Sequence, residues 1–258
     1  MHGHSPLAKV NVDASHRYGP LVVHERLEFS VAANEFVCIC GPSGCGKTTL
    51  LDMLAGILKP SQGHVLIDGT QADPKRQNIS FVFQEPSTYP WLTVRENVAT
   101  GLKIKGAPRA EIDAKVRDII RIVGLTDFEG YYPHQISGGM KQRVAIARAF
   151  ATDADLILMD EPFVSLDQPT RERMQREVLD IWRHRKRTVI FVTHNLEEAV
   201  FLGDRILILS AKPARIVAEL PVKLQHPRDP LSREFTEIRA QCVRWLHASE
   251  TDDRRASQ

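Results

Sequence analysis

Residues 41–49 of the chain read Gly41-Pro42-Ser43-Gly44-Cys45-Gly46-Lys47-Thr48-Thr49. This stretch follows the apolar run Phe36 to Ile39 and opens a segment with helical periodicity, Lys47 to Leu58. Glycines let the backbone turn tightly, so that successive N–H groups point into the turn, and a helix N-terminus adds the positive end of its dipole. A glycine-rich turn that only caps a helix is the alternative. The full pattern between a strand and a helix favours a loop that binds phosphate groups.

Two side chains of this loop have expected roles of their own. The Lys47 ammonium is expected to reach the β and γ phosphates of a nucleotide, and the Thr48 hydroxyl to bind Mg²⁺. Cys45 fills a position whose side chain is free to vary, and we assign it no chemistry. The whole stretch, residues 41–49, is the candidate nucleotide-binding loop.

A pair of adjacent carboxylates ends another apolar run, Leu156 to Met159. Neighbouring residues on a strand point to opposite sides, so Asp160 and Glu161 can have different roles. Asp160 is expected to hold the Mg²⁺ shell. Glu161 is expected to face the water that attacks the γ-phosphate and to act as general base. A solvated acidic strand end is the alternative, which the upstream phosphate loop disfavours.

Short apolar or β-branched runs recur along the chain and alternate with helical patterns. The runs are Phe36 to Ile39, Val65 to Ile67, Ile79 to Phe83, Leu156 to Met159, Val189 to Val192 and Ile206 to Leu209. The helical patterns include Lys47 to Leu58, Glu172 to Arg185 and Leu196 to Leu202. This alternation predicts an α/β fold whose sheet is mostly parallel and buried on both faces.

The middle and the end of the chain depart from this alternation. Residues 86–153 have almost wholly helical patterns, including Arg109 to Val123 and Gly138 to Ala151, which predicts an inserted helical subdomain. Residues 221–230 are proline-rich, and Leu231 to Leu246 has the pattern of one short amphipathic helix. Ala248 to Gln258 is expected to be frayed or disordered. The expected domains are therefore 8–220 and a tail over 221–258.

Composition excludes several classes of protein. The 258 residues are 43% hydrophobic and 26% charged, which is ordinary for a globular chain, and the net charge of +2 gives no reason to expect a nucleic-acid partner. No run of about 20 apolar residues could cross a bilayer, so we expect a cytosolic chain. Three of the four cysteines, Cys38, Cys40 and Cys45, crowd one strand and its loop, which favours core packing over a metal site or a disulfide framework.

The most specific motif for identifying a family is Ile136-Ser137-Gly138-Gly139-Met140, which lies upstream of Asp160. Here the chain resembles the ATPases of ABC transporters, whose signature reads Leu-Ser-Gly-Gly-Gln. The resemblance implies a P-loop NTPase (RecA-like) core with an N-terminal antiparallel β part. It also implies a homodimer, or a pair with another ATPase subunit, in which Ser137, Gly138, Gly139 and Met140 meet the ATP bound to the opposite subunit. Taken alone, Ser-Gly-Gly could equally be a helix N-cap.

Further family elements follow in the expected order. Gln84 resembles the glutamine that senses Mg²⁺ and water, and Ser165-Leu166-Asp167 resembles the loop in which Asp167 sets the dimer geometry. His194 is similar to the switch histidine that contacts the γ-phosphate. Tyr18 stands where relatives place an aromatic ring against adenine, although an exposed tyrosine can equally be packing surface. The resemblance implies that Glu161, His194, Gln84 and Lys47 are the catalytic groups, with Mg²⁺ bound by Thr48, Gln84 and Asp160.

Four longer sequence segments resemble those of one branch of the family, the ATPases of nitrate, sulfonate and taurine importers. They are Val82 to Pro86, Pro90 to Val98, Tyr132 to Met140 and Glu197 to Leu202. A methionine in the signature is typical of that branch, whereas Ser87-Thr88-Tyr89 and Asn195 depart from it. The resemblance implies peripheral attachment to the cytoplasmic face of the inner membrane, separate permease subunits and, indirectly, a periplasmic or extracellular solute-binding protein.

A groove by Gln84 and the helical insert, with Glu85, Tyr89 and Trp91, is expected to receive a permease helix; Trp91 packing into the subdomain core is the alternative. Two other functions remain open. One is a soluble ABC ATPase that acts on nucleic acid or ribosomes, although the long coiled coils or paired ATPase units usual in such proteins are missing. The other is a nucleotide-sensing module, against which Glu161 and His194 argue.

Overall fold

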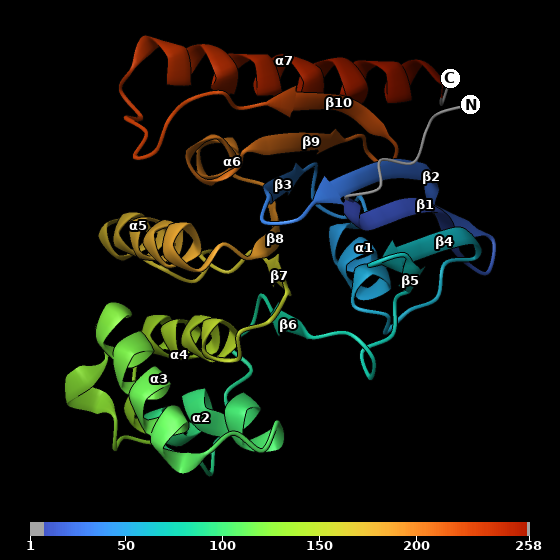
Figure 1. Ribbon diagram of the computed structural model, residues 1–258. Coiled ribbons are helices and arrows are strands. Elements are labelled where there is room, and N and C mark those ends of the chain that lie inside the picture. Colours follow the sequence, from blue (N-terminus) through green and yellow to red (C-terminus); the bar gives the residue numbers. More distant parts are fainter. Residues whose placement is uncertain (1–7, 257–258) are drawn as a thin grey trace. The chain divides into compact units, whose positions relative to one another are not determined.

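The computed structural model describes residues 8–256, and the chain divides into two compact units. Unit 1 comprises the residues up to Asn78 together with those from Lys186 onward, and unit 2 comprises Ile79–Arg185. Figure 1 shows the elements of both units coloured along the sequence. The domain bounds expected from the sequence, 8–220 and 221–258 with an insert over 86–153, stay predictions.

Unit 1 begins with an antiparallel sheet. Its strands are β1 (Ala8–Tyr18), β2 (Leu21–Ala32), β4 (Gln62–Ile67) and β5 (Thr70–Gln71), in the order β2-β1-β4-β5. The expectation that Val65 to Ile67 is buried on both faces is wrong. Val65 and Ile67 are buried while Leu66 between them is half-buried, and this alternation is typical of an antiparallel strand that covers a core with one face.

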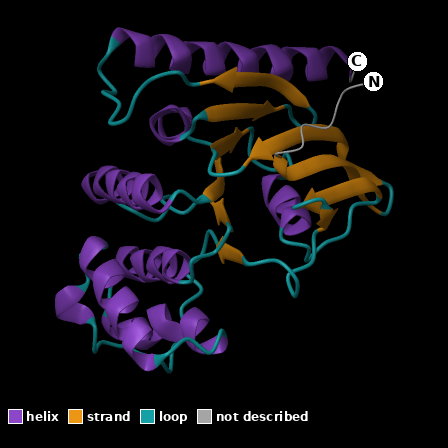
Figure 2. Cartoon of the chain, in the orientation of Figure 1, coloured by secondary structure: helices purple, strands orange, loops and turns teal. Residues whose placement is uncertain are grey.

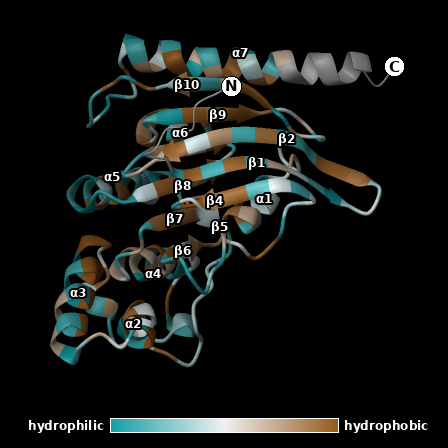
Figure 3. Cartoon of the chain, turned by 45° about the vertical axis from the view of Figure 1, so that its right-hand side comes forward, coloured by the Kyte–Doolittle hydropathy of each residue, from teal (hydrophilic) through white to brown (hydrophobic). Residues whose placement is uncertain are grey.

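The parallel part of unit 1 carries the phosphate loop. Strand β3 (Phe36–Cys40) is buried at every residue and lies between β8 (Thr188–Thr193) and β9 (Arg205–Leu209), parallel to both. Strand β10 (Ile216–Pro221), which the sequence did not predict, is antiparallel to β9 at the edge. Figure 3 shows the apolar character of β9. The buried run at β3 ends at the glycine-rich loop, as the sequence pattern predicts.

Among the described residues, three helices complete unit 1. Helix α1 (Lys47–Leu54) follows the loop and ends before Leu58, because the backbone turns at Gly56 with φ +70°. Helix α6 (Leu196–Leu202) is confirmed as predicted. Helix α7 (Arg233–Ala256) has 24 residues and packs against α6, β9 and β10 (Figure 1). It starts later than expected and continues beyond Leu246, so the prediction of a short helix with a frayed end was wrong for 248–256; residues 257–258 lie outside the described part.

The proline-rich segment before α7 is fixed by one buried cation. Arg228 is 5% exposed, and its guanidinium donates to the carbonyl oxygens of Val200 at 2.6 Å and Gly203 at 2.7 Å, at the end of α6. Burial lowers the pKa of Arg228 to about 10. Its guanidinium nitrogens also reach the carbonyl oxygens of Phe201, Val222 and Leu224. A helix C-terminus leaves carbonyl groups without partners, and Arg228 satisfies several of them at once.

Unit 2 is mainly helical, as Figure 2 shows. Strands β6 (Ile79–Val82) and β7 (Leu156–Asp160) are parallel, and α2, α3 and α4 pack on one another. The helices of unit 2 are α2 (Val94–Ile104), α3 (Arg109–Ile122), α4 (Gly138–Ala151) and α5 (Gln168–Arg185), with the 3-10 turns Thr126–Phe128 and Pro133–Gln135. No helix within residues 8–256 is both long and apolar enough to cross a membrane.

Candidate functional site

The backbone of the glycine-rich loop has the shape that phosphate binding needs. Gly44 and Gly46 have φ of +77° and +103°, a region that side chains strongly disfavour. A Cβ atom on Gly46 would lie 2.5 Å from Val23 Cγ1, and one on Gly41 would lie 2.9 Å from Cys45 Sγ. A side chain at Gly41 or Gly46 would therefore collide with its neighbours. With glycine at these positions, the loop can expose its N–H groups without side chains in the way.

Lys47 is held inside the loop. Its side chain is buried, and Nζ donates to the carbonyl oxygens of Gly41 at 2.9 Å and Pro42 at 3.0 Å. A buried ammonium needs acceptors, and these carbonyl oxygens at the edge of the loop supply them. Phosphate oxygens bound in the loop would be stronger acceptors for the same ammonium, because they carry charge.

The start of α1 offers donors to the same loop. Gly46 is the N-cap, and among the described residues no side chain makes a capping hydrogen bond to this helix end. Thr48 is exposed one residue into the helix, and Thr49 is half-buried. Cys45 points inward, and its burial raises the pKa of the thiol. The loop can thus bind a phosphate chain with backbone groups, Lys47 and a hydroxyl, without a thiolate.

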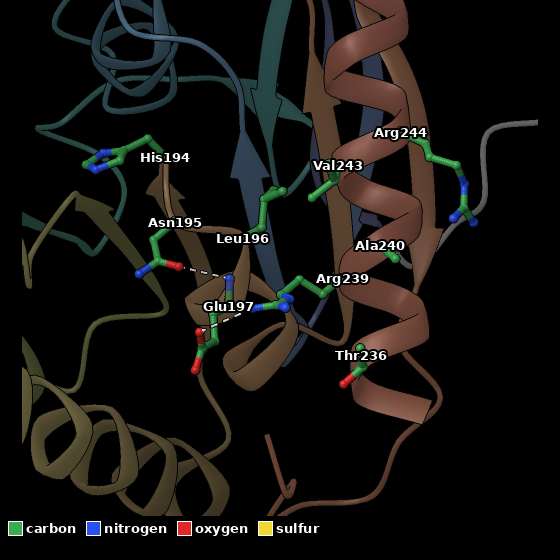
Figure 4. Close-up of a pocket in the computed structure, with 9 residues that line it drawn as sticks. All are labelled: His194, Asn195, Leu196, Glu197, Thr236, Arg239, Ala240, Val243 and Arg244. Carbon is green, nitrogen blue, oxygen red and sulfur yellow. Dashed lines mark hydrogen bonds and ion pairs between the residues drawn. The ribbon is translucent and has the colours of Figure 1, made fainter. Parts of the chain in front are cut away.

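His194 follows β8 and is exposed beside a pocket of about 730 Å³. Figure 4 shows that residues of α7 form the opposite wall, where Arg239 reaches Glu197 at 3.8 Å. Asn195 caps α6, because its Oδ1 accepts the N–H of Glu197 at 2.9 Å. Asparagine caps helices as well as aspartate does, so this departure from the family pattern leaves the local structure intact. The ring of His194 is therefore presented on a well-formed strand-to-helix turn.

Tyr18 ends β1 and has an exposed ring. Its side chain is 51% exposed, and the ring of His16 packs edge-on against it with 4.7 Å between centroids. Because about half of its surface is exposed, this aromatic ring can stack on a planar base.

In unit 2, the strand-end carboxylates differ in environment. Asp160 is buried at 5% exposure, whereas Glu161 is half-buried. Glu161 has φ +44°, in the left-handed region that costs a glutamate about 1–3 kcal/mol. Such strain concentrates at functional sites because the surrounding structure must hold it. The sequence predicted different orientations for the two side chains, but it gave no sign of this backbone turn.

The segment after β6 carries Gln84, which is exposed. The residue before it, Phe83, is bound by α4: the side-chain amide of Gln142 donates to the Phe83 carbonyl oxygen at 3.2 Å. Gln142 is completely buried, and its Oε1 has no hydrogen-bond partner among the described groups. Sequence reasoning missed Gln142, although it lies within the signature helix.

The Ser-Gly-Gly segment and Asp167 are both helix caps. Ser137 Oγ accepts the N–H of Met140 at 3.2 Å and begins α4, with Gly138 exposed and Met140 half-buried. A Cβ on Gly139 would lie 3.0 Å from Leu166 Cδ2, so the signature packs against the residue before Asp167. Asp167 Oδ1 accepts the N–H of Thr170 at 3.1 Å, and this bond lowers the pKa of the aspartate. The capping alternative for Ser-Gly-Gly is therefore part of the structure.

The expected site residues divide between the units. Unit 1 holds Tyr18, the loop 41–49 and His194; unit 2 holds Gln84, Ser137 to Met140, Asp160, Glu161 and Asp167. The expected Mg²⁺ ligands fit the ion chemically, because hydroxyl, amide and carboxylate oxygens are what Mg²⁺ binds.

A glycine-rich phosphate loop after a buried parallel strand, with a carboxylate pair at the end of another, defines a P-loop ATPase. The family model described as ABC transporter matches residues 24–164. An uncharacterized ABC transporter ATP-binding protein of Methanocaldococcus jannaschii is 46% identical over 86% of this chain and 83% of its own length. The aliphatic sulfonates import ATP-binding protein SsuB of Bacillus cereus is 44% identical over 87% of this chain and 88% of its own.

Solved structures agree with these sequence matches. The ATP-binding cassette MJ0796, in a dimeric post-hydrolysis state with ADP and Pi, is 31% identical with a TM-score of 0.73, covering 84% of this chain and all of that one. The cbiO1 protein of Clostridium perfringens, part of the ABC transporter complex cbiONQ, has a TM-score of 0.75 and covers 84% of this chain and 90% of its own. At 24% identity this match shows a similar fold. The chain belongs to the ABC transporter ATP-binding family, and it is an ATPase.

Proposed function

We propose that this chain is the ATP-hydrolysing subunit of an importer for a small organic solute of the sulfonate type. The observation that carries the proposal is the 44% identity, over most of both chains, with a sulfonate import ATP-binding protein. The four sequence segments that resemble importer ATPases lie in both units. Taurine is itself a sulfonate, nitrate is the other solute that the resemblance implies, and the solute contacts other subunits.

In unit 1 the loop 41–49 binds the phosphate chain of ATP. Lys47 neutralises the β and γ phosphates, which supplies electrostatic stabilisation where negative charge gathers in the transition state. The exposed ring of Tyr18 stacks on adenine, and the exposed ring of His194 contacts the γ-phosphate. The exposure of both rings supports these roles.

In unit 2 Glu161 orients and deprotonates the attacking water, and Gln84 senses the state of the nucleotide. The positive φ of Glu161 supports the assignment, because backbone strain of this kind concentrates at functional sites. Thr48, Asp160 and Gln84 are the residues that would hold Mg²⁺, which would supply positive charge to offset that of the phosphates. Asp160 contributes a buried carboxylate to this set.

Two such chains form the working unit. Ser137, Gly138, Gly139 and Met140 of one subunit bind the ATP held by the loop of the other, and Asp167 helps to set the geometry between subunits. The exposure of Ser137 and Gly138 at the start of α4 supports this, since a helix N-terminus with free donors attracts phosphate oxygens. Binding of ATP closes the dimer, and hydrolysis with product release reopens it.

A permease binds the aromatic surface of unit 2. The Trp91 side chain is 69% exposed and packs on Tyr89 with 5.7 Å between ring centroids, and the Arg148 guanidinium lies 5.3 Å from the Tyr89 centroid. The alternative that Trp91 packs in the subdomain core was wrong. A large exposed tryptophan is typical of the centre of a protein interface. The chain then acts at the cytoplasmic face of the membrane, with a solute-binding protein on the far side.

Reconstitution with a permease that co-purifies with this chain tests the proposal. Proteoliposomes are expected to take up a radiolabelled alkanesulfonate only with ATP inside and only with both proteins present. Trp91→Ala is expected to reduce co-purification with the permease at least about tenfold, as a hot-spot residue would. Ile104→Ala, which also removes an exposed apolar side chain from unit 2, is the matched control. ATP-independent uptake, or ATPase activity stimulated by ribosomes or nucleic acid instead, would contradict the proposal.

A further inference from the structure

One buried histidine contacts the nucleotide-binding loop without being part of it. His24 lies in β2, its side chain is 0% exposed, and its ring Nε2 is 3.1 Å from the carbonyl oxygen of Gly46. No motif in the sequence points to His24, because the contact joins a strand to a loop far along the chain.

The chemistry of the two groups fixes the state of the ring. A carbonyl oxygen can only accept, so Nε2 carries the hydrogen and donates it to Gly46. Nδ1 then carries a lone pair, and it has no hydrogen-bond partner among the described groups. Burial lowers the pKa of His24 to about 4, so the ring is neutral at physiological pH.

The accepting carbonyl is the one that begins α1. The Gly46 oxygen also accepts the N–H of Leu50 at 2.9 Å, which is the first hydrogen bond of the helix. One oxygen therefore takes two donors, one from the helix and one from His24. Together they fix the orientation of the peptide group between Gly46 and Lys47, whose N–H belongs to the loop.

The backbone that carries His24 is itself fixed. Ala214 donates its N–H to the Val23 carbonyl at 2.8 Å and accepts the N–H of Glu25 at 3.1 Å, on either side of the histidine. A Cβ on Gly46 would lie 2.6 Å from His24 Nε2. The ring thus fills the space under Gly46 and leaves that residue little freedom to move toward β2.

We propose that His24 is a positioning residue for ATP binding, which holds the Gly46 carbonyl through its Nε2–H and so keeps the start of α1 in the shape that receives phosphate. The inference rests on the proposed nucleotide-binding role of the loop 41–49. It assigns to His24 no contact with ATP and no part in proton transfer.

Two substitutions separate the hydrogen bond from the packing. His24→Leu keeps an apolar side chain of similar reach and removes the donor, whereas His24→Gln places an amide nitrogen where Nε2 stands. Thr188→Val is the matched control, because Thr188 is also buried in unit 1 and accepts the N–H of Asn34 at 3.0 Å, at the other end of the parallel strands from the loop.

The measurements are ATP affinity with a fluorescent nucleotide, KM and kcat for ATP, and the melting temperature of each variant. His24→Leu is expected to weaken ATP binding and raise KM roughly five- to tenfold, the worth of one hydrogen bond, with a smaller change in kcat. His24→Gln is expected to restore affinity to within about twofold. Thr188→Val is expected to lower the melting temperature and leave ATP affinity unchanged.

Wild-type ATP affinity in a folded His24→Leu protein, or no recovery with glutamine, would overturn the inference. If the leucine variant does not fold, ¹⁵N spectra of histidine-labelled wild type decide, with the His24 signal assigned by its loss in His24→Gln. The Nε2–H tautomer is expected, and the Nδ1–H tautomer refutes the bond. If the wild-type chain does not bind ATP at all, both the proposed function and this inference are wrong. If the wild-type chain binds ATP and substitution of His24 does not change the affinity, only the inference is wrong.

Discussion

Gln142 and Phe83 are joined by a hydrogen bond of 3.2 Å from a completely buried side-chain amide to a main-chain carbonyl. One partner belongs to the helix that Ser137 begins, and the other immediately precedes Gln84. The bond therefore links the signature helix to the backbone beside Gln84. A shift of the signature helix would move the backbone next to Gln84.

Gln142→Leu is expected to slow ATP turnover about tenfold with little change in ATP affinity, because a small misplacement of a catalytic group costs this much. Loss of the bond should also lower the free energy of unfolding by about 1 kcal/mol. Steady-state phosphate release and urea denaturation measure the two effects. Thr100→Val, which removes a hydroxyl bonded within α2, serves as control. Equal loss of turnover in both variants would argue against a specific link.

Glu161→Gln is expected to retain ATP binding and to reduce kcat at least about a hundredfold, because an amide cannot accept the proton of the attacking water. The variant should accumulate as an ATP-bound dimer, seen by gel filtration with light scattering. Phosphate release is measured in parallel. Hydrolysis at the wild-type rate would remove Glu161 from its role as general base.

Stability is expected to fall on acidification because of His24. Its pKa is about 4 in the folded chain and 6.5 when unfolded, so between these values the unfolded state binds more protons. The contribution is full above pH 6.5 and is lost as the pH falls toward 4, by about 3 kcal/mol in all. The test is the difference in urea stability between wild type and His24→Gln. Between pH 6.5 and 4 wild type should lose about 3 kcal/mol of stability relative to His24→Gln; an unchanged difference would contradict the prediction.

Arg228→Met is expected to destabilise the chain by roughly 2–4 kcal/mol, because several buried carbonyl groups at the end of α6 lose their donor. Lysine should not restore stability, since one ammonium cannot replace a planar fork of donors. Urea denaturation measures both variants. Arg233→Met, at a side chain that is 89% exposed, should change stability by less than about 0.5 kcal/mol. Similar losses at both arginines would contradict the carbonyl argument.

The sequence predicts those parts of the fold whose signal is local. Buried runs such as those of β3 and β8 identify the parallel strands, and the glycine pattern identifies the loop, because each requirement is met by consecutive residues. The extent of α7 was not predictable in this way, since its buried residues, such as Phe235 and Cys242, are widely spaced and are covered by other elements.

The candidate site shows the same division. Lys47 and Ser137 could be found because a motif surrounds them, and the structure adds how each is held. His24, Gln142 and the left-handed turn at Glu161 carry no local signal, because each depends on a contact or a backbone angle that exists only after folding. Residues that position a functional group are therefore identified only from the tertiary structure, whereas sequence patterns identify the functional groups themselves.

The native cysteines are Cys38, Cys40, Cys45 and Cys242, all of them buried free thiols. Burial raises the pKa of every one, to about 11 for Cys242, so at neutral pH almost no thiolate is available to an alkylating reagent. We therefore expect the wild-type chain to be an unreactive background for maleimide chemistry. Ser43→Cys and Gly138→Cys, both at exposed positions, would each provide a single reactive site for spectroscopic labels or for covalent joining of two copies.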